Sequence, residues 1–511
     1  MSLVGQLLHT SIQTIPQKTF FTKDIASQQI KALKKLLLAA QRTEFGKRFD
    51  FDELIKMKDP RAEFAKWIPV YTYDRMQREW WHRSRNDQRN ITWPGIVPYY
   101  GLSSGTTQAS SKYIPVTQES LSAWNKISKK IFFNLKRFHN VNAHILSKQS
   151  LMVGGSESLI KEGKHFIGDN SGIMARHRPL WLSTLYRPES RIQLLPEWEE
   201  RMQAIFDHAP QWDIAFIVGN IAWIQLICEK VMQQYGLHSI QEIWPHLTLL
   251  INSGIHIDPY VSSFDQLLDK PIHYLNIYSA TEGILAYQDT QSPDLKLITN
   301  QNIYFEFIPF NEVYFKEDGT LINEYVQTIP IEEVRENVDY ALLISTSSGA
   351  WHYSIGDVIR FTDKEAGKIK IIGRTKDQIS LTGEHLTVDH IHKTIQYLND
   401  HYQLEIQEYM VTGQKTKSVT HTWYVSSNQS MDPKKISQYI DAYLKSINDD
   451  YAVQRSSLVD SVEVKQIPVN CFYQWLASRG KLNGQAKLPR IASDDLRKNW
   501  ESFLSSYTGS F

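Results

Sequence analysis

The stretch YYGLSSGTTQASSKYIPVT, residues 99–117, places a run of small hydroxyl residues between two apolar segments. Small residues let the backbone turn tightly, so that successive amide N–H groups point into one concavity that binds anions. Lys112 follows the run and adds a positive charge suited to a phosphate. The stretch therefore predicts a loop for nucleotide phosphates, with a polar surface turn as the alternative. The residues at its centre are Ser103, Ser104, Gly105, Thr106 and Thr107.

Length and composition limit the class of protein. A chain of 511 residues predicts two or more domains. Lys and Arg number 56 and Asp and Glu 55, so the net charge is +1, which argues against a nucleic-acid binder with a basic face. The two cysteines, Cys228 and Cys471, are too few for a disulfide framework or a zinc cluster. No signal peptide or membrane span is evident, and we expect a cytoplasmic protein.

Alternating helix and strand patterns predict an α/β fold. Residues 24–42 read as an amphipathic helix with Asp24 as N-cap, residues 118–138 as another helix, and residues 214–228 as a buried helix or a strand followed by a helix. Strands are expected at 247–252 and 272–278, each followed by small or polar residues. Ligands in such sheets bind beyond the carboxyl ends of the strands.

The later part of the chain is richer in strands. We expect strands at 303–308, 312–315, 340–346 and 358–361. The short charged segment 373–377 interrupts the pattern and could be a hinge. Beyond it, strands at 405–412, 421–426 and 461–467 and a helix at 433–447 indicate a smaller α+β region.

Four further motifs carry candidate functional residues. NIYSATEG (276–283) offers Tyr278 for stacking on a base and Glu282 for a metal, or a surface carboxylate. WHYSIGD (351–357) offers Asp357, which could accept from two ribose hydroxyls or merely terminate a turn. GRTKDQISLTGEHL (373–386) contains Arg374, which could form an exposed ion pair with Asp377. GQAKLPRI (484–491) contains Lys487, which alone is equally compatible with a surface lysine.

Taken in order, these motifs resemble those of the superfamily of acyl-CoA synthetases, peptide-synthetase adenylation domains and luciferases. The flanking sequences are most similar to the bacterial branch of the auxin-responsive promoter family of acyl acid–amido synthetases. The similar pieces are RTEFGKRFDF (42–51), IPVYTYDRM (68–76), SSGTTQASSKYIPVT (103–117), INSGIHIDPY (251–260), YSATEG, WHYSIGDVIRF and GQAKLPR.

This resemblance implies a role for each matching residue. The loop from Ser103 to Thr107, with Lys112, would hold the ATP phosphates. Thr281 would contact the α-phosphate, Glu282 would help place Mg²⁺, and Lys487 would approach the α-phosphate during adenylation. The residues expected around the adenine and the ribose are Ser253, Gly254, Tyr278, Ser279, Ala280, Asp357 and Arg374.

The resemblance also implies a fold and an activity. Residues 1–374 would form a large adenylate-forming domain with sheets and flanking helices, and residues 375–511 a smaller, mobile α+β lid. The activity would be that of an AMP-forming ligase that adenylates a carboxylic acid and transfers the acyl group to an amine, expected to be an amino acid. A CoA ligase and a non-catalytic nucleotide-binding protein are the alternatives. No nucleic-acid or membrane partner is expected.

Two positions depart from the family pattern. Ala109 lies in the phosphate loop where relatives often carry Gly or Pro, and His352 stands where an Arg is common. Either change could alter nucleotide binding. The acid pocket is expected to draw on residues 118–138, 152–156 and 214–223, whose aromatic and aliphatic side chains suit an apolar acid.

Overall fold

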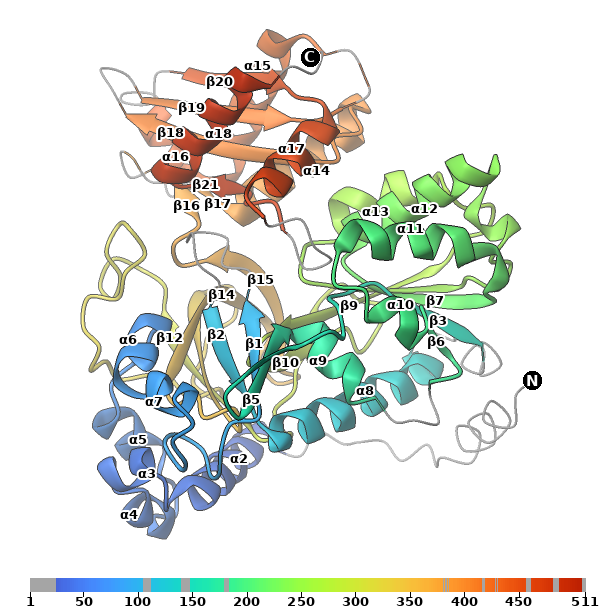
Figure 1. Cartoon of the computed structure of the whole chain (residues 1–511). Helices are drawn as coiled ribbons and strands as arrows, with labels where there is room; N and C mark the ends of the chain where they lie inside the picture. The colour runs from blue at the N-terminus through green and yellow to red at the C-terminus, as the bar shows by residue number, and fades with distance from the viewer. Residues whose placement is uncertain are drawn as a thin grey trace.

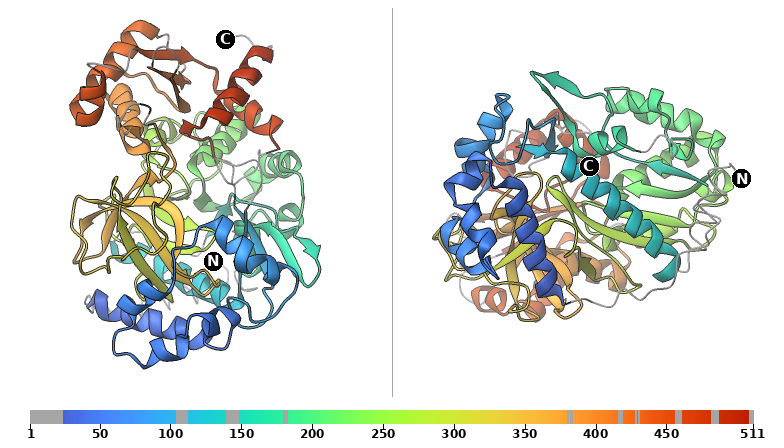
Figure 2. Two further views of the ribbon diagram at one scale, coloured as in Figure 1. Left: turned by 90° about the vertical axis from the view of Figure 1, so that its left-hand side faces the viewer. Right: turned by 90° about the horizontal axis from the view of Figure 1, so that it is seen from below.

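The computed structural model describes residues 24–103, 112–138, 148–178, 183–379, 381, 384, 386–415, 419–427, 429, 431–455, 461–480 and 487–507. Its centre is an 11-stranded sheet in the order β12-β13-β14-β15-β11-β10-β9-β8-β7-β3-β6. The C-terminal part stands apart at the top of Figure 1, in orange and red. In the left view of Figure 2 the N-terminal helices, in blue, lie at the opposite end of the molecule from this part. In the right view, seen from below, they lie nearer to the viewer than this part.

The large sheet has one parallel half and one antiparallel half. In the parallel half, β6, β3, β7, β8 and β9 are neighbours in this order. In the other half, the strands from β9 to β15 pair antiparallel with their neighbours. Strand β7 and the start of β8 are apolar, as expected where helices cover both faces of a sheet. The strands are β3 (Gln149–Met152), β6 (Tyr186–Arg187), β7 (Ile214–Gly219), β8 (Leu249–Ser253), β9 (His273–Ala280), β10 (Gly283–Tyr287), β11 (Leu295–Leu297), β12 (Ile303–Pro309), β13 (Asp339–Thr346), β14 (Tyr353–Asp363) and β15 (Lys368–Arg374).

Helices pack on opposite faces of the parallel half. Successive side chains of a strand point to opposite faces, so Leu249 packs against the long helix α8 and Leu250 packs against the helices on the other side. Helix α8 (Gln118–Phe138) crosses the view from below in Figure 2. The other side carries α10 (Ser190–Gln193), α11 (Trp198–His208), η4 (Ala209–Gln211), α12 (Ile221–Tyr235), η5 (Ile240–Glu242) and α13 (Asp258–Asp265).

The N-terminal helices cover the antiparallel half. Helix α2 (Ile25–Ala40) is capped by Asp24, whose side chain accepts a hydrogen bond from the N–H of Ala26, and its leucines join the core with β12 to β14. The shorter helices are α3 (Glu44–Arg48), α4 (Phe51–Lys56), α5 (Arg61–Trp67), α6 (Tyr73–Met76), the π-helical turn η1 (Gln77–Trp81) and α7 (His82–Arg85).

A second, four-stranded sheet has the order β2-β1-β5-β4. Its strands are β1 (Tyr99–Ser103), β2 (Lys112–Val116), β4 (Ile160–Glu162) and β5 (His165–Asp169), and α9 (Asn170–Arg176) follows β5. Strand β1 lies against the connection between β9 and β10, since a Cβ on Gly101 would come 2.5 Å from Thr281 Cγ2. This contact places β1, one of the two strands that flank the phosphate loop, beside the connection between β9 and β10 of the large sheet.

The C-terminal part is a four-stranded sheet with helices. The sheet order is β20-β19-β18-β21, and a two-stranded ribbon of β16 and β17 precedes it. Its elements are β16 (Gln378–Ile379), β17 (Leu386–Thr387), α14 (Val388–Tyr402), β18 (Tyr409–Lys415), β19 (Val419–Val425), α15 (Pro433–Ile447), α16 (Asp449–Arg455), β20 (Ser461–Gln466), α17 (Val469–Ser478), β21 (Ile491–Ala492) and α18 (Asp494–Ser506).

Most predicted elements are confirmed, including α2, α8, α15 and the strand-then-helix reading of residues 214–228. The predicted strand at 312–315 is wrong: this segment forms a turn, and only Phe315 makes an isolated bridge, to Leu321. The strand expected from residue 405 begins only at Tyr409. Among the described residues, none of the helices combines the length and the apolar character that crossing a membrane requires.

Candidate active site

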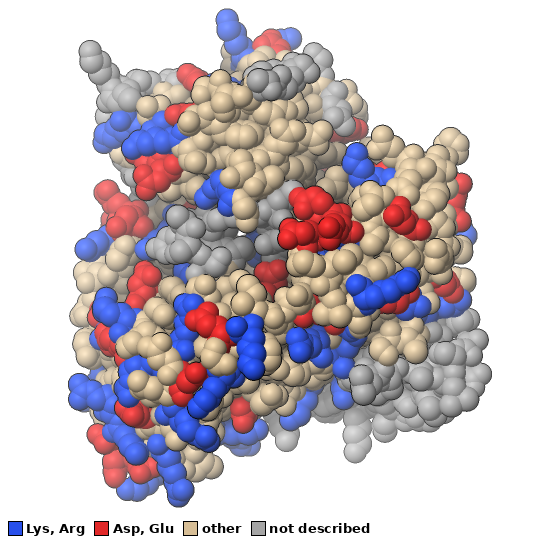
Figure 3. Space-filling view, in the orientation of Figure 1, with Lys and Arg blue, Asp and Glu red and all other residues tan. Residues whose placement is uncertain are grey.

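One large cavity gathers the predicted functional residues. It has a volume of about 1160 Å³ and lies where the large sheet, the β1–β2 sheet and the C-terminal part meet. In Figure 3 the molecule is hollowed between the C-terminal part and the body below it, and Lys, Arg, Asp and Glu are interspersed over the lower left of this face. The predicted residues that line the cavity are Ser103, Lys112, Ser253, Gly254, Tyr278, Ser279, Ala280, Thr281, Glu282, Asp357, Arg374 and Lys487.

The two ends of the phosphate loop reach this cavity. Ser103 ends β1 and Lys112 begins β2, and the two residues are paired across the antiparallel ladder. Burial lowers the pKa of the Lys112 amine, and the nearby Arg374 acts in the same direction, while Glu282 opposes both. A cation in such a place gains from an anionic ligand. The other predicted loop residues, Ser104, Gly105, Thr106 and Thr107, lie outside the described residues, as does Ala109.

The carboxyl ends of β8 and β9 form one wall. These strands are parallel neighbours, with Ser253 opposite Ile277, so their ends meet at the same edge of the sheet. The hydroxyls of Ser253 and Ser279 are hydrogen-bonded to each other at 2.7 Å. Gly254 follows with φ +101°, a conformation that favours glycine. This wall is narrow, apolar at Ile277 and bordered by small residues, which leaves room for a flat ring.

An aromatic residue, a carboxylate and a guanidinium are joined across the sheet. The Tyr278 hydroxyl donates to Oδ2 of Asp357 at 2.5 Å, and Nε of Arg374 lies 3.1 Å from Oδ1 of the same carboxylate. Asp357 and Arg374 face each other in the β14–β15 register. Burial opposes the charge of Arg374, but Asp357 raises the pKa of its guanidinium. Arg374 is therefore paired with Asp357, and the predicted exposed ion pair with Asp377 is wrong.

Thr281 and Glu282 form the two-residue connection between β9 and β10, because Ala280 pairs with Gly283. Glu282 is only 9% exposed, so the surface-carboxylate alternative is wrong. Burial raises the pKa of its carboxyl; its own backbone N–H, Lys112 and a hydrogen bond from Tyr353 oppose that shift. A carboxylate held in this way beside a phosphate loop suits Mg²⁺, which takes one or two carboxylates together with substrate phosphates. Among the described residues no group of three metal-ligating side chains occurs.

Lys487 enters the cavity from the C-terminal part. A Cβ on Gly254 would lie 3.0 Å from its Cε and 3.3 Å from its Nζ, so the lysine crosses directly over this glycine. Burial lowers the pKa of the Lys487 amine, while Asp357 raises it and Arg374 lowers it further. The amine therefore lies among the residues expected around the nucleotide, and the surface-lysine alternative is wrong.

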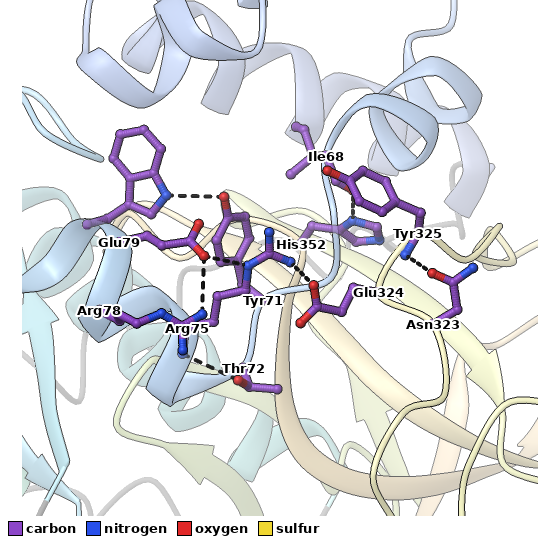
Figure 4. A network of polar contacts seen from close by, with 11 residues as sticks. Ile68, Tyr71, Thr72, Arg75, Arg78, Glu79, Asn323, Glu324, Tyr325 and His352 are labelled. Atoms are coloured by element: carbon purple, nitrogen blue, oxygen red, sulfur yellow. Dashed lines mark hydrogen bonds and ion pairs between the residues drawn. The ribbon is translucent and has the colours of Figure 1, made fainter.

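His352 does not reach the cavity. Its ring is buried, with Nδ1 2.7 Å from the carbonyl oxygen of Ile68 and Nε2 3.6 Å from Oε1 of Glu306. Figure 4 shows the imidazole turned toward Ile68. The expectation that His352 alters nucleotide or acid binding directly is therefore not supported by its position.

The motif at residues 68–76 supports the start of β14. The N–H of Tyr71 donates to the carbonyl of His352 at 2.9 Å, and the N–H of Ser354 donates to the carbonyl of Tyr71 at 2.8 Å. Arg75, close by in Figure 4, donates to Glu79 at 2.8 Å and also pairs with Glu324. These contacts hold the strand that carries Tyr353 and Asp357, although neither 68–76 nor His352 lines the cavity.

Several apolar side chains line the cavity. Each of the three segments expected at the acid pocket contributes to the lining: Trp124 and Phe132 come from α8, Met152 from β3 and Phe216 from β7. The rings of Phe132 and Phe216 are 6.3 Å apart. Tyr260 and Arg490, which belong to the motifs INSGIHIDPY and GQAKLPR, meet at the mouth of the cavity. Sequence reasoning assigned neither a role, although both motifs were recognised.

Three domain models of one protein family match successive parts of the chain. The GH3 family N-terminal domain matches residues 15–153, the GH3 family central domain 296–374 and the GH3 family C-terminal domain 389–495. An indole-3-acetic acid-amido synthetase, GH3.4 of Arabidopsis thaliana, is 21% identical over 71% of this chain and 69% of its own length. A jasmonoyl–L-amino acid synthetase, JAR4 of Nicotiana attenuata, is 21% identical over 68% of each chain.

Solved structures share the fold. The GH3.15 acyl acid amido synthetase has a TM-score of 0.75 at 16% identity, with 96% of this chain and 95% of that chain covered. A 2-hydroxyisobutyryl-CoA ligase in complex with 2-HIB-AMP has a TM-score of 0.56 at 10% identity, covering 99% and 92%. The three matching domains succeed one another in order and together span well over half of the residues. The chain therefore belongs to the GH3 family.

Proposed function

We propose that the protein is an AMP-forming acyl acid–amido synthetase: it adenylates a carboxylic acid with ATP and transfers the acyl group to an amine. The observation that carries this proposal is the convergence of Lys112, Glu282, Asp357 and Lys487 on one cavity. These residues come from four separate parts of the sequence. They supply two cations for phosphate charge, a carboxylate for a metal and a carboxylate for a ribose. The relatives named amido synthetases support the same activity.

The first half of the reaction joins the acid to AMP. A carboxylate oxygen attacks the α-phosphorus, the bond to pyrophosphate breaks, and an acyl-adenylate forms. Negative charge grows around phosphorus in this step. Lys487 and Lys112 would oppose that charge, with Thr281 at the α-phosphate. Glu282 would hold Mg²⁺, which when bound neutralises phosphate charge. The remaining nucleotide contacts are proposed for Ser103 to Thr107, Ser253, Gly254, Tyr278, Ser279, Ala280, Asp357 and Arg374.

The second half releases AMP. A neutral amine attacks the acyl carbonyl, the C–O bond to the adenylate breaks, and the amine loses a proton as the amide forms. Water must be kept from the adenylate, since hydrolysis would waste it. We propose residues 375–511 as the smaller domain that closes the cavity over residues 1–374, with the turn after Arg374 as the hinge. The backbone N–H of Asp377 donates to the carbonyl of Arg374 in this turn.

The apolar side chains that line the cavity favour an apolar or aromatic acid. Trp124, Phe132, Met152 and Phe216 would surround the acid's carbon skeleton. The relatives named for indole-3-acetic acid and the GH3.15 structure in complex with 2,4-DB support this class. An amino acid is the proposed amine, as in the relative named jasmonoyl–L-amino acid synthetase. We also propose the acyl-CoA synthetase and luciferase superfamily as the wider relationship, and the bacterial branch as this chain's place in its family.

Acid-dependent pyrophosphate exchange tests the first half of the reaction. The protein would be incubated with MgATP, labelled pyrophosphate and a panel of aromatic and aliphatic acids, with thermal shift as a parallel binding measurement. We expect exchange with apolar acids and none without acid. Mass spectrometry of products, with a mixture of amino acids or with CoA, then tests the second half. An amide is expected; a CoA thioester alone would indicate a CoA ligase, and ATP binding without exchange would contradict the proposal.

A further inference from the structure

A buried polar cluster joins the C-terminal part to helix α13. The Tyr260 hydroxyl, on α13, donates to Oε1 of Glu408 at 2.9 Å, and Nη2 of Arg490 donates to the same hydroxyl at 2.6 Å. Glu408 and Arg490 both belong to the C-terminal part. Tyr260 thus makes two hydrogen bonds from one body of the molecule to an ion pair in the other.

The ion pair itself is held firmly inside the C-terminal part. Nη1 of Arg490 is 2.7 Å from Oε2 of Glu408 and donates to the carbonyl of Tyr409 at 3.0 Å. The guanidinium also lies over the Tyr409 ring, 4.1 Å from its centroid. The side chains of Arg490 and Glu408 are only 10% and 3% exposed. Hydrogen bonds to buried charges are among the stronger ones in proteins, so the Tyr260 hydroxyl matters to this pair.

Arg490 is only three residues from Lys487. The two intervening residues, Leu488 and Pro489, are buried, and the carbonyl of Arg490 accepts from the N–H of Val411 on β18. Pro489 has a restricted backbone, so few freely rotating backbone bonds separate Arg490 from Lys487. Where Arg490 is held, Lys487 is therefore placed as well.

The other side of the contact is also a short stretch of chain. Gly254, over which Lys487 lies, precedes Tyr260 by six residues, and the intervening segment leads from β8 into α13. Two short segments consequently touch at both ends: Lys487 against Gly254, and Arg490 against Tyr260. A contact at two points restricts the movement of the two bodies relative to each other more than either contact would alone.

We infer that Tyr260 is a positioning residue, which holds Lys487 in the cavity by anchoring Arg490 and Glu408. This inference rests on the proposed function for its meaning, because Lys487 is the residue proposed to meet the α-phosphate. The bridge joins the two bodies in the arrangement in which Lys487 lies over Gly254. Tyr260 touches neither reacting group and acts only through the ion pair.

The chain offers a matched control for this role. Tyr473, on α17, also donates its hydroxyl to Oε1 of Glu408, at 3.0 Å. Tyr473 and Glu408 both lie in the C-terminal part, so this bond does not cross between the two bodies. Tyr260→Phe and Tyr473→Phe each remove one phenol hydroxyl from the same carboxylate oxygen. Only Tyr260→Phe removes the bridge.

The deciding experiment measures the accessibility of the Lys487 amine in the full-length protein. Acetic anhydride at low concentration would label the lysines, and mass spectrometry would give the labelling rate of Lys487 relative to the exposed Lys434. We expect Tyr260→Phe to label Lys487 about tenfold faster than the wild type, since the lost bonds join a charged pair. Tyr473→Phe should match the wild type. MgATP should protect Lys487 in the wild type and in Tyr473→Phe, and less in Tyr260→Phe.

Equal labelling of Lys487 in Tyr260→Phe and the wild type would overturn the inference, as would the same increase in both tyrosine variants. Arg490→Lys keeps the positive charge but replaces the planar fork that contacts Glu408 and Tyr260 with a single ammonium group; it gives a second route should Tyr260→Phe unfold, and it should also speed labelling. Thermal unfolding checks that each variant is folded. Labelling needs no acid substrate, so its result is independent of pyrophosphate exchange, whose absence in the wild type would instead refute the proposed function.

Discussion

The hydroxyl of Tyr278 donates a 2.5 Å hydrogen bond to Oδ2 of Asp357, across the sheet from β9 to β14. Arg374 occupies the other carboxylate oxygen at 3.1 Å. Asp357 is therefore aimed into the cavity by two partners before any ligand is present. Such pre-orientation lowers the cost of ordering side chains when a ligand binds.

Tyr278→Phe should weaken MgATP binding. The change keeps the ring but removes the donor to Asp357, and a hydrogen bond to a charged group is worth about 1.5 kcal/mol or more, which corresponds to about a tenfold increase in Kd. Isothermal titration calorimetry measures this directly. Tyr340→Phe is the control, because the Tyr340 hydroxyl accepts from the N–H of Arg335 and does not line the cavity. Equal Kd values in both variants would show that Tyr278 does not orient Asp357 for the nucleotide.

Lys487→Ala should slow adenylation while MgATP binding is largely kept. The amine opposes charge that appears mainly as the α-phosphorus is attacked, and loss of one such group costs on the order of a hundredfold in rate. Pyrophosphate exchange and calorimetry together separate the two effects. Lys434→Ala, at an exposed position of α15, serves as the control. An undiminished exchange rate would remove Lys487 from the mechanism.

Gly254→Ala should impair both folding and adenylation, whereas Gly236→Ala should impair folding alone. Both glycines have positive φ, +101° and +64°, so a side chain at either position costs about 1 kcal/mol or more of the free energy of unfolding. A Cβ at Gly254 would also press on Lys487 at 3.0 Å, but nothing lies within 4 Å of a Cβ at Gly236. Urea unfolding and pyrophosphate exchange measure the two effects. An equal loss of exchange in both variants would contradict the contact with Lys487.

The buried pair of Glu306 and His352 predicts a pH-dependent stability. Burial raises the pKa of Glu306 to about 8 and lowers the pKa of His352 to about 4. Between about pH 4.5 and 8 the folded chain keeps the Glu306 proton and the unfolded chain releases it, so this group makes stability fall as the pH rises. His352 acts oppositely between about pH 4 and 6.5, because there only the unfolded chain is protonated at this residue.

Above pH 6.5 only Glu306 of this pair still changes the free energy of unfolding, which its titration lowers by about 1.4 kcal/mol per pH unit. Glu306→Gln should therefore gain stability relative to the wild type as the pH rises from about 6.5 to 8, by urea unfolding. Gln can still accept the hydrogen bond that Thr328 donates to Glu306 at 2.8 Å. Parallel curves for the two proteins across this range would show that Glu306 is already ionised.

Much of the fold could be predicted locally. The apolar spacing in α2 and α15 and the N-cap Asp24 are visible in the sequence, and both helices begin and end close to the predicted positions. The segment 312–315 misled because its β-branched and aromatic residues suit a strand only when a partner strand is available. Here the chain turns at once, and the N–H of Phe315 donates to the carbonyl of Asn311.

The sequence indicated which residues belong to the candidate site more completely than it indicated which of them touch each other. Each candidate residue followed from a motif, since phosphate loops and strand ends use recognisable residue types. The partner of Arg374 did not follow, because Asp377 is near in sequence while Asp357 is brought opposite by the β14–β15 register. His352 was expected to affect the site because it adjoins the Tyr353–Asp357 motif, but its ring points to the other side of the strand, toward Ile68.

The order and residue types of the motifs indicated the family, many of the helices and strands around each motif, and those predicted residues that line the cavity among the described ones. Only the tertiary structure decided which of them touch: Tyr278 with Asp357, Gly254 with Lys487, and Tyr260 with Arg490, 230 residues apart. The physical reason is that periodicity and turn chemistry are properties of neighbours along the chain. Contacts across the molecule depend on strand order, register and the approach of two separately folded sheets.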